Sequence, residues 1–255
     1  MPADFLSLVH TLADTAREIA LRYYRQPVPV EIKADASPVT LADRQIEERL
    51  RNILADQRPD DTVQGEEFDR TTGTSAFTWL IDPIDGTKSF VIGRPTFGTL
   101  ITLCQGNTPV LGMMDFPVTG ERWIGGRDQA TTWNGRPVRT RSCSRLDHAY
   151  AGIYDPAYNG PLGNTWISRL TKAVRQMNWH GDCYFYGLIA SGHMDLIVEP
   201  KMSPHDFLPM VPVIEGAGGR VTDWHGRPLT LKSEGHAVAV GSPDLLAQIL
   251  PLLQK

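Results

Sequence analysis

The sequence predicts an α/β fold in which an antiparallel sheet in the first half joins a mixed α/β second half. Between residues 96 and 137, short strand-like runs alternate with Gly, Pro and Asn turns, a pattern typical of an antiparallel meander. Beyond about residue 145, strand-like and helix-like segments alternate, which is typical of βα units. No internal repeat or low-complexity linker separates the halves. We therefore expect a single unit over residues 1–255, with halves at 1–144 and 145–255 that share an interface.

The first half begins with two amphipathic helices. Apolar residues at helical spacing predict one helix over residues 3–24, which ends before Pro27, and a second from Thr40 to a stop before Pro59. The continuous apolar run Phe77–Ile81 predicts a strand that is buried on both faces. A loop is expected at 35–38 and a hairpin turn at Asn134-Gly135. The other strands expected in this half are 30–33, 62–63, 96–104, 110–116 and 121–124.

The second half is predicted to alternate strands with helices that carry apolar residues on one face. Its expected strands are 150–154, 196–199, 220–224 and 237–240. Its expected helices are 166–177, 184–191, 207–217 and 244–253.

Composition and charge exclude several classes of function. The chain has 255 residues, 41% hydrophobic and 21% charged, as is typical of a soluble globular protein. Its net charge of −4 and the lack of a basic stripe argue against nucleic-acid binding. No apolar segment is long enough to cross a bilayer, and no signal-peptide pattern is present. Cys104, Cys143 and Cys183 lie far apart without metal or disulfide spacing, so we expect thiols in the reducing cytoplasm.

An acidic turn follows the apolar run 77–81. Asp82 and Asp85 lie close together across a proline-stiffened turn, and Gly86-Thr87 could open a helix. Carboxylates held this close repel one another, and folded proteins usually tolerate such repulsion because a divalent cation compensates it. The alternative is an ordinary Asp-Pro turn with an Asx-type hydrogen bond.

Two other acidic sites also have structural readings. Asp43 in Thr40-x-x-Asp43 fits a capping box at the start of the second helix, and on its own this pattern favours the cap. The adjacent Glu66 and Glu67 are, taken alone, more typical of solvated surface charge than of metal ligands.

Taken together and in order, these motifs resemble the inositol monophosphatase superfamily of magnesium-dependent phosphatases. The resemblance rests on Asp43, Gly65-Glu66-Glu67, Asp82-Pro83-Ile84-Asp85-Gly86-Thr87, Asp206 and the helix end Glu215-Gly216-Ala217-Gly218-Gly219. It extends along nearly the whole chain and implies the layered α-β-α-β-α sugar-phosphatase fold. One departure is His205, which stands where many members have Trp.

The resemblance implies a role for each acidic residue. Glu66, Asp82, Asp85, Asp206 and the backbone carbonyl of Ile84 would bind two or three Mg²⁺ ions. Oxygen-only ligands suit such hard cations better than they suit zinc.

The same resemblance assigns the reaction to neighbouring groups. Glu66 and Thr87 would hold the attacking water, and Asp43 would act through metal-bound water and orient Thr87. The N–H groups of Gly86 and Thr87 would hold phosphate oxygens.

Two later segments indicate the substrate. Residues 181–193 and 203–207 look like the histidinol-phosphate phosphatase branch of this superfamily. Asp182 would bind the ammonium and imidazole of L-histidinol phosphate, because an anion favours both groups. Glu199 would face the leaving group, and Asp206 would also contact the substrate. The alternative reading of Asp182 is a cap on the helix 184–191.

The resulting expectation is a magnesium-dependent histidinol-phosphatase of histidine biosynthesis, acting on a small phosphate ester. An inositol-1-phosphate or broad sugar monophosphatase is the alternative, and a non-catalytic regulator is a third reading that the complete ligand set disfavours. The resemblance also implies a homodimer and inhibition by Li⁺. His180, His193 and His205 are expected to be structural because no carboxylate–His ligand spacing surrounds them in sequence. The sequence leaves the roles of Glu67 and Lys88 open.

Overall fold

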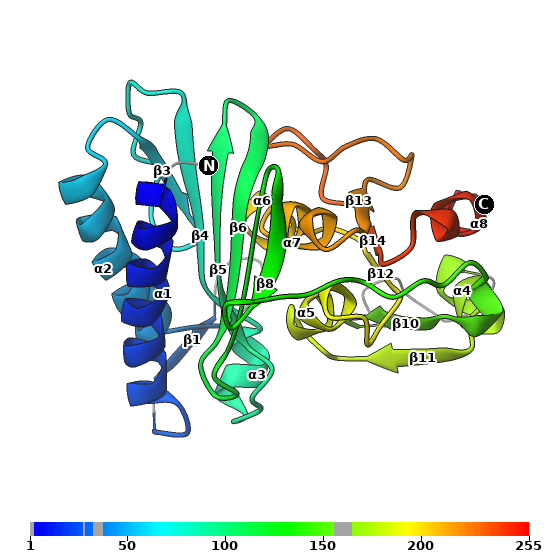
Figure 1. Cartoon of the computed structure of the whole chain (residues 1–255). Helices are drawn as coiled ribbons and strands as arrows, with labels where there is room; N and C mark the ends of the chain where they lie inside the picture. The colour runs from blue at the N-terminus through cyan, green and yellow to red at the C-terminus, as the bar shows by residue number, and fades with distance from the viewer. Residues whose placement is uncertain (1–2, 28, 33–37, 156–164, 255) are drawn as a thin grey trace.

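The computed structural model describes residues 3–27, 29–32, 38–155 and 165–254. Two helices, α1 (Ala3–Tyr23) and α2 (Leu41–Gln57), cover one face of a large sheet, as Figure 1 shows. Helices α5 (Tyr184–Ala190), α6 (Pro204–Phe207) and α7 (Met210–Gly216) lie beyond its other face. A second sheet and the helices α4 (Trp166–Ala173) and α8 (Leu246–Leu253) form the far side of the molecule.

The large sheet has seven strands in the order β3-β4-β5-β6-β7-β8-β9. β3 pairs with β4 in parallel, and every later neighbour pairs antiparallel, which confirms the predicted meander and the hairpin at Asn134-Gly135. Its strands are β3 (Thr62–Gly65), β4 (Phe77–Asp85), β5 (Gly98–Gln105), β6 (Thr108–Phe116), β7 (Glu121–Gly126), β8 (Gln129–Trp133) and β9 (Arg136–Pro137).

Strand β4 is buried on both faces, as its apolar run predicts. Trp79 and Ile81 pack with the α1 and α2 layer, whereas Leu80 packs with the side chains of α5 and α7. The expected end at Ile81 is wrong, because the strand continues to Asp85. A register shift between Asp82 and Asp85 lets both residues stay paired with β5, so the acidic turn is an irregular strand end.

The second sheet has five strands in the order β11-β10-β12-β14-β13. β10 is parallel to both β11 and β12, and β14 is antiparallel to β12 and β13. The strands are β10 (Tyr150–Ile153), β11 (Gln176–Trp179), β12 (Leu196–Glu199), β13 (Arg220–Thr222) and β14 (Ala237–Val240).

Two predicted helices have different bounds. The helix expected at 166–177 ends at Ala173, since Val174 is extended and β11 then pairs with β10. The helix expected at 207–217 is two helices, α6 and α7. Pro209 has no N–H to donate, so a single continuous helix would lose a hydrogen bond at this point.

Smaller differences lie at the two ends of the chain. The expected loop 35–38 lies outside the described residues except for Pro38, which begins β2 (Pro38–Thr40), a strand that pairs with β1 (Val30–Ile32). The C-terminal helix begins with a 3₁₀ turn at Pro243–Leu245. Among the described residues, no helix combines the length and the apolarity needed to cross a membrane.

The large sheet and the second half share one hydrophobic cluster. Leu100, Phe116 and Trp123 from the sheet pack with Ile189 and Phe207 from the helices beyond it. The start of α7 lies close to the sheet. A β-carbon at Gly112 in β6 would lie only 2.1 Å from the carbonyl oxygen of Pro209, the residue before the helix. This packing fixes α6, which directly precedes α7, against the end of β4.

Candidate active site

A cavity of about 300 Å³ opens where β4, α3 (Thr87–Val91), α5 and α6 meet. It is lined by residues from both halves of the chain. All but one of the predicted site residues line it: Glu66, Asp82, Ile84, Asp85, Gly86, Thr87, Asp182, Glu199 and Asp206. The exception is Asp43, which is fully buried at the start of α2.

Three acidic side chains meet at the end of β4. Ligand oxygens of Asp82, Asp85 and Asp206 lie within 4.8 Å of one another. The Cys183 N–H donates to Asp85 Oδ2 at 3.0 Å, and the Ser203 N–H donates to Asp206 Oδ2 at 2.7 Å. Asp82 Oδ1 is buried and has no hydrogen-bond partner among the described residues. Since the Asp85 carboxylate is held by a distant segment, a simple Asx turn does not account for it.

The electrostatics of this cluster are unfavourable without a cation. Burial, together with the charges of Glu66, Asp85 and Asp206, raises the pKa of Asp82 well above its usual range. Burial and the charge of Asp206 raise the pKa of Asp85 to about 7. The pKa of Asp206 is raised as well, chiefly by burial. An orphaned carboxylate oxygen among crowded acids fits a hard divalent cation, which prefers such oxygens.

Asp43 has the capping role that its spacing predicts. The Thr40 N–H and hydroxyl donate to Asp43 Oδ2 at 2.8 Å and 2.6 Å. Asp43 Oδ1 has no hydrogen-bond partner in the described part of the chain, and burial raises the pKa of Asp43 to about 6, with added repulsion from Glu67 and Glu66. The Thr87 hydroxyl donates to the Ile84 carbonyl at 3.0 Å, so its orientation by Asp43 stays a prediction.

The loop that carries Glu66 is held by a buried ion pair on α2. Arg51 Nε donates to Glu47 Oε1 at 2.7 Å, and Glu47 Oε2 accepts from the Glu67 N–H at 2.7 Å. A β-carbon at Gly65 would lie 1.9 Å from Glu47 Oε1, so only glycine lets the carboxylate approach the loop this closely. The Glu67 backbone therefore helps to position the Glu66 side chain.

Asp182 is not a helix cap. The N-cap of α5 is Cys183, which makes no side-chain cap hydrogen bond. Asp182 Oδ2 instead accepts a hydrogen bond from the Thr96 hydroxyl, while Oδ1 is buried without a partner among the residues described. A β-carbon at Gly86 would lie 3.0 Å from the Asp182 carboxyl carbon. Asp182 thus lies directly beside the turn that begins α3.

Glu199 closes the other side of the cavity. Its Oε1 accepts from the Tyr154 N–H at 2.6 Å, which ties the ends of β12 and β10 together. Burial raises the pKa of Glu199 to about 8, so without a cation beside it this side chain is largely protonated at neutral pH. A cationic group in the cavity would favour its ionised form.

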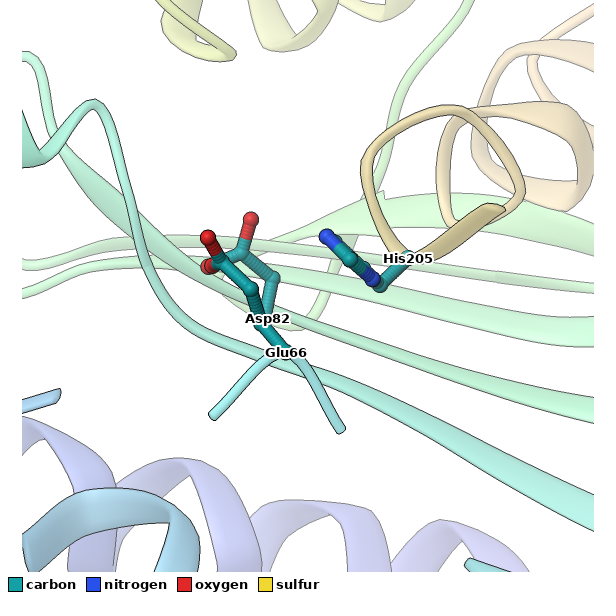
Figure 2. Close-up of side chains that lie close together, drawn as sticks. All are labelled: Glu66, Asp82 and His205. Atoms are coloured by element: carbon teal, nitrogen blue, oxygen red, sulfur yellow. The ribbon is translucent and has the colours of Figure 1, made fainter. Parts of the chain in front are cut away.

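His205 is the main feature that sequence reasoning missed. No sequence spacing joins it to carboxylates, but in space its ring lies beside the carboxylates of Glu66 and Asp82. The ligand atoms of the three side chains lie within 4.8 Å of one another (Figure 2). Tyr154 and Lys201 also line the cavity, and their only sequence signal is a position at or just after a predicted strand end. Lys88 lines it too, 5.9 Å from the Tyr154 ring.

Comparisons with known proteins show the family to which the chain belongs. The sequence model of the inositol monophosphatase family matches residues 2–255. The chain is 40% identical over 259 residues to the chloroplastic bifunctional phosphatase IMPL2 of Arabidopsis thaliana, covering 98% of this chain and 75% of that protein. It is 35% identical over 232 residues to the histidinol-phosphatase of Chlorobaculum parvum, covering 90% of each chain.

Solved structures confirm the predicted fold. An inositol monophosphatase from Zymomonas mobilis superposes with a TM-score of 0.90 at 40% identity, over 100% of both chains. The layered α-β-α-β-α arrangement expected from the sequence is therefore present.

The raised carboxylate pKa values predict how stability depends on pH. The pKa of Asp85 rises from 3.8 to about 7, so in metal-free buffer the folded state binds more protons than the unfolded state between these pH values. Its contribution to the free energy of unfolding is then lost as pH rises through this window. Asp85→Asn removes that loss. We expect the variant to gain stability over the wild type, by about 4 kcal/mol at most at pH 8, since each pKa unit corresponds to about 1.4 kcal/mol.

Urea unfolding of both metal-free proteins from pH 4.5 to 8 measures this difference. A stability difference that stays constant across the range would show that Asp85 is not destabilised by ionisation. Adding a divalent cation should raise the free energy of unfolding of the wild type above that of the variant at pH 8, because the variant lacks one charged metal ligand.

Proposed function

Because the chain belongs to the inositol monophosphatase family and is a phosphatase of that fold, we propose that it hydrolyses L-histidinol phosphate to L-histidinol and phosphate with Mg²⁺. The relative named histidinol-phosphatase, 35% identical over 90% of this chain, supports the substrate. The observation that carries the proposal is the Asp182 carboxylate, which lies beside Gly86 and has one buried oxygen without a hydrogen-bond partner within the described structure.

The carboxylates at the end of β4 would hold the metal. Glu66, Asp82, Asp85 and Asp206, with the Ile84 carbonyl, offer only hard oxygen donors, which suit Mg²⁺. When bound, Mg²⁺ would lower the pKa of a water molecule and offset the charge of the phosphate. Ionisation of Asp82, Asp85 and Asp206 would accompany binding, since a cation favours the charged form of each.

Neighbouring groups would position the reactants. The Thr87 hydroxyl donates its proton to the Ile84 carbonyl, so its oxygen can accept a hydrogen bond from the attacking water. Glu66 would take the proton of that water as general base. The N–H groups of Gly86 and Thr87 at the start of α3 would hold phosphate oxygens, because the backbone turns there in a left-handed conformation with φ of 85° at Gly86.

The acidic wall of the cavity would recognise the cationic part of the substrate. Histidinol phosphate carries an ammonium and a protonatable imidazole, and Asp182 and Glu199 face the same cavity. A substrate cation would favour ionisation of both acids, whose pKa values burial raises. A phosphate ester with only hydroxyl groups would bring no cation to these partly buried acids, so their recognition by charge favours the amino-alcohol substrate.

An inositol or sugar monophosphatase is the second candidate. The relative at 40% identity is named a bifunctional phosphatase, and the structure at 40% identity is that of an inositol monophosphatase. Hydroxyl groups could also donate to Glu199 and Asp182.

We also propose that residues 1–255 act as one catalytic unit. The metal cradle combines Asp82 and Asp85 of the first half with Asp206 of the second. Asp182 and Glu199, which form the acidic wall, both belong to the second half. Neither half would hold both the phosphate and the leaving group.

Phosphate release on two substrates tests the proposal. We expect a higher kcat/KM on L-histidinol phosphate than on inositol 1-phosphate, by about tenfold or more, because a charge-assisted hydrogen bond contributes about 1.5–3 kcal/mol. Both activities should vanish on metal removal and return with Mg²⁺. A preference for inositol 1-phosphate would assign the chain to the second candidate.

Asp182→Asn tests the recognition residue. We expect KM for histidinol phosphate to rise about 10- to 100-fold, because the amide cannot pair with a cation at the strength of a carboxylate. Hydrolysis of p-nitrophenyl phosphate, which has no cationic group, should change little. The exposed Asp128→Asn is the matched control, since Asn tolerates the positive φ of 62° found there. Equal losses on both substrates would make Asp182 a structural residue.

A further inference from the structure

We propose that His205 makes one position of the metal cradle a mixed oxygen and nitrogen site, which binds Zn²⁺ in preference to Mg²⁺. The inference rests on the proposed function, because it uses three of the carboxylates assigned there to Mg²⁺, those of Glu66, Asp82 and Asp206. It adds a ligand, and with it a metal preference, that an all-oxygen cradle would not have.

The geometry brings the imidazole to the carboxylates. Figure 2 shows the His205 ring extending from α6 toward Glu66 and Asp82, and the ligand atoms of all three lie within 4.8 Å of one another. His205 Nε2 also lies 3.2 Å from Asp206 Oδ1. Ligands bonded to zinc at about 2.0–2.2 Å in a tetrahedron lie roughly 3.4 Å apart. The spacing therefore suits two ligands of one ion.

The carboxylate oxygens around the His205 ring are placed where they could bind a metal ion. Asp82 is 2% exposed, and its Oδ1 makes no hydrogen bond to any described residue. Asp206 Oδ2 accepts the Ser203 N–H, so its Oδ1 is the atom that faces His205. Asp82 Oδ1 and Asp206 Oδ1 are therefore the atoms that could bind a metal ion together with the His205 ring.

Ligand chemistry then decides the metal. Imidazole nitrogen suits zinc and cobalt, whereas Mg²⁺ binds oxygen and keeps much of its hydration. Carboxylate–imidazole sets are common around zinc, with Zn–N distances of about 2.0–2.1 Å. Zn²⁺ should therefore compete with Mg²⁺ at this position at much lower concentration.

Calorimetric titration of the metal-free full chain tests the proposal. Zn²⁺ and Mg²⁺ are each titrated into the wild type, His205→Gln and His193→Gln, the last being an exposed histidine that serves as the control. We expect His205→Gln to lower the Zn²⁺ affinity at least ~10-fold, as loss of a supporting group does at metal sites, and the Mg²⁺ affinity less than ~3-fold. His193→Gln should match the wild type for both metals.

A second measurement needs no variant to fold. One equivalent of Co²⁺ bound to the wild type should give a hyperfine-shifted proton resonance that disappears in D₂O, the N–H of a coordinated imidazole. Its absence, or an equal loss of Zn²⁺ and Mg²⁺ affinity in His205→Gln, would make His205 only an ion-pair partner of Asp206. If neither metal binds the wild type, the proposed function fails together with this inference. If Mg²⁺ still binds, the proposed function stands and only the role of His205 fails.

Discussion

Repulsion among the carboxylates of Glu66, Asp82, Asp85 and Asp206 is the constraint on which the rest of this structure depends. Burial removes the water that would otherwise screen them, so the pKa values of Asp82, Asp85 and Asp206 are raised, and a hard cation is the simplest compensation. A protein selected only for stability would replace such acids with apolar or neutral residues. Because they line a cavity that both halves of the chain share, we propose this point as the chemical centre.

The fold holds these acids together by packing on both sides of one strand. The α1 and α2 layer covers one face of β4, and the shared cluster under α5 and α7 covers the other, so the end of the strand cannot relax away from the charges. Backbone N–H groups then fix two of the acids, since Cys183 donates to Asp85 and Ser203 to Asp206. The buried Glu47–Arg51 pair does the same for the loop of Glu66. Rigid elements thus offset part of the repulsion that a cation would remove.

Local chemistry made most of the fold predictable from sequence, and long-range contacts account for what was missed. The period of apolar residues marked α1, α2 and the central strands, and the hexapeptide at the end of β4 marked the acids. Short strands such as β2 and β11 were missed because their pairing partners, rather than their own residues, define them. The sequence predicts a structural role for His205 because no carboxylate stands at ligand spacing from it along the chain, whereas its carboxylate neighbours in space come from β4 and the loop after β3. The sequence allows Asp182 to be a cap or a recognition residue, and the cap is excluded only by the structure, in which Cys183 is the N-cap and Asp182 contacts Thr96.

Anomalous diffraction from crystals of the full chain soaked in Mn²⁺ can show whether these carboxylates bind a cation, because Mn²⁺ shares the oxygen preference of Mg²⁺ and scatters anomalously. We expect a strong peak within bonding distance, about 2.0–2.3 Å, of carboxylate oxygens of Asp82, Asp85 and Asp206. A cavity without an anomalous peak at saturating Mn²⁺, or a peak bound only by surface acids elsewhere, would contradict it.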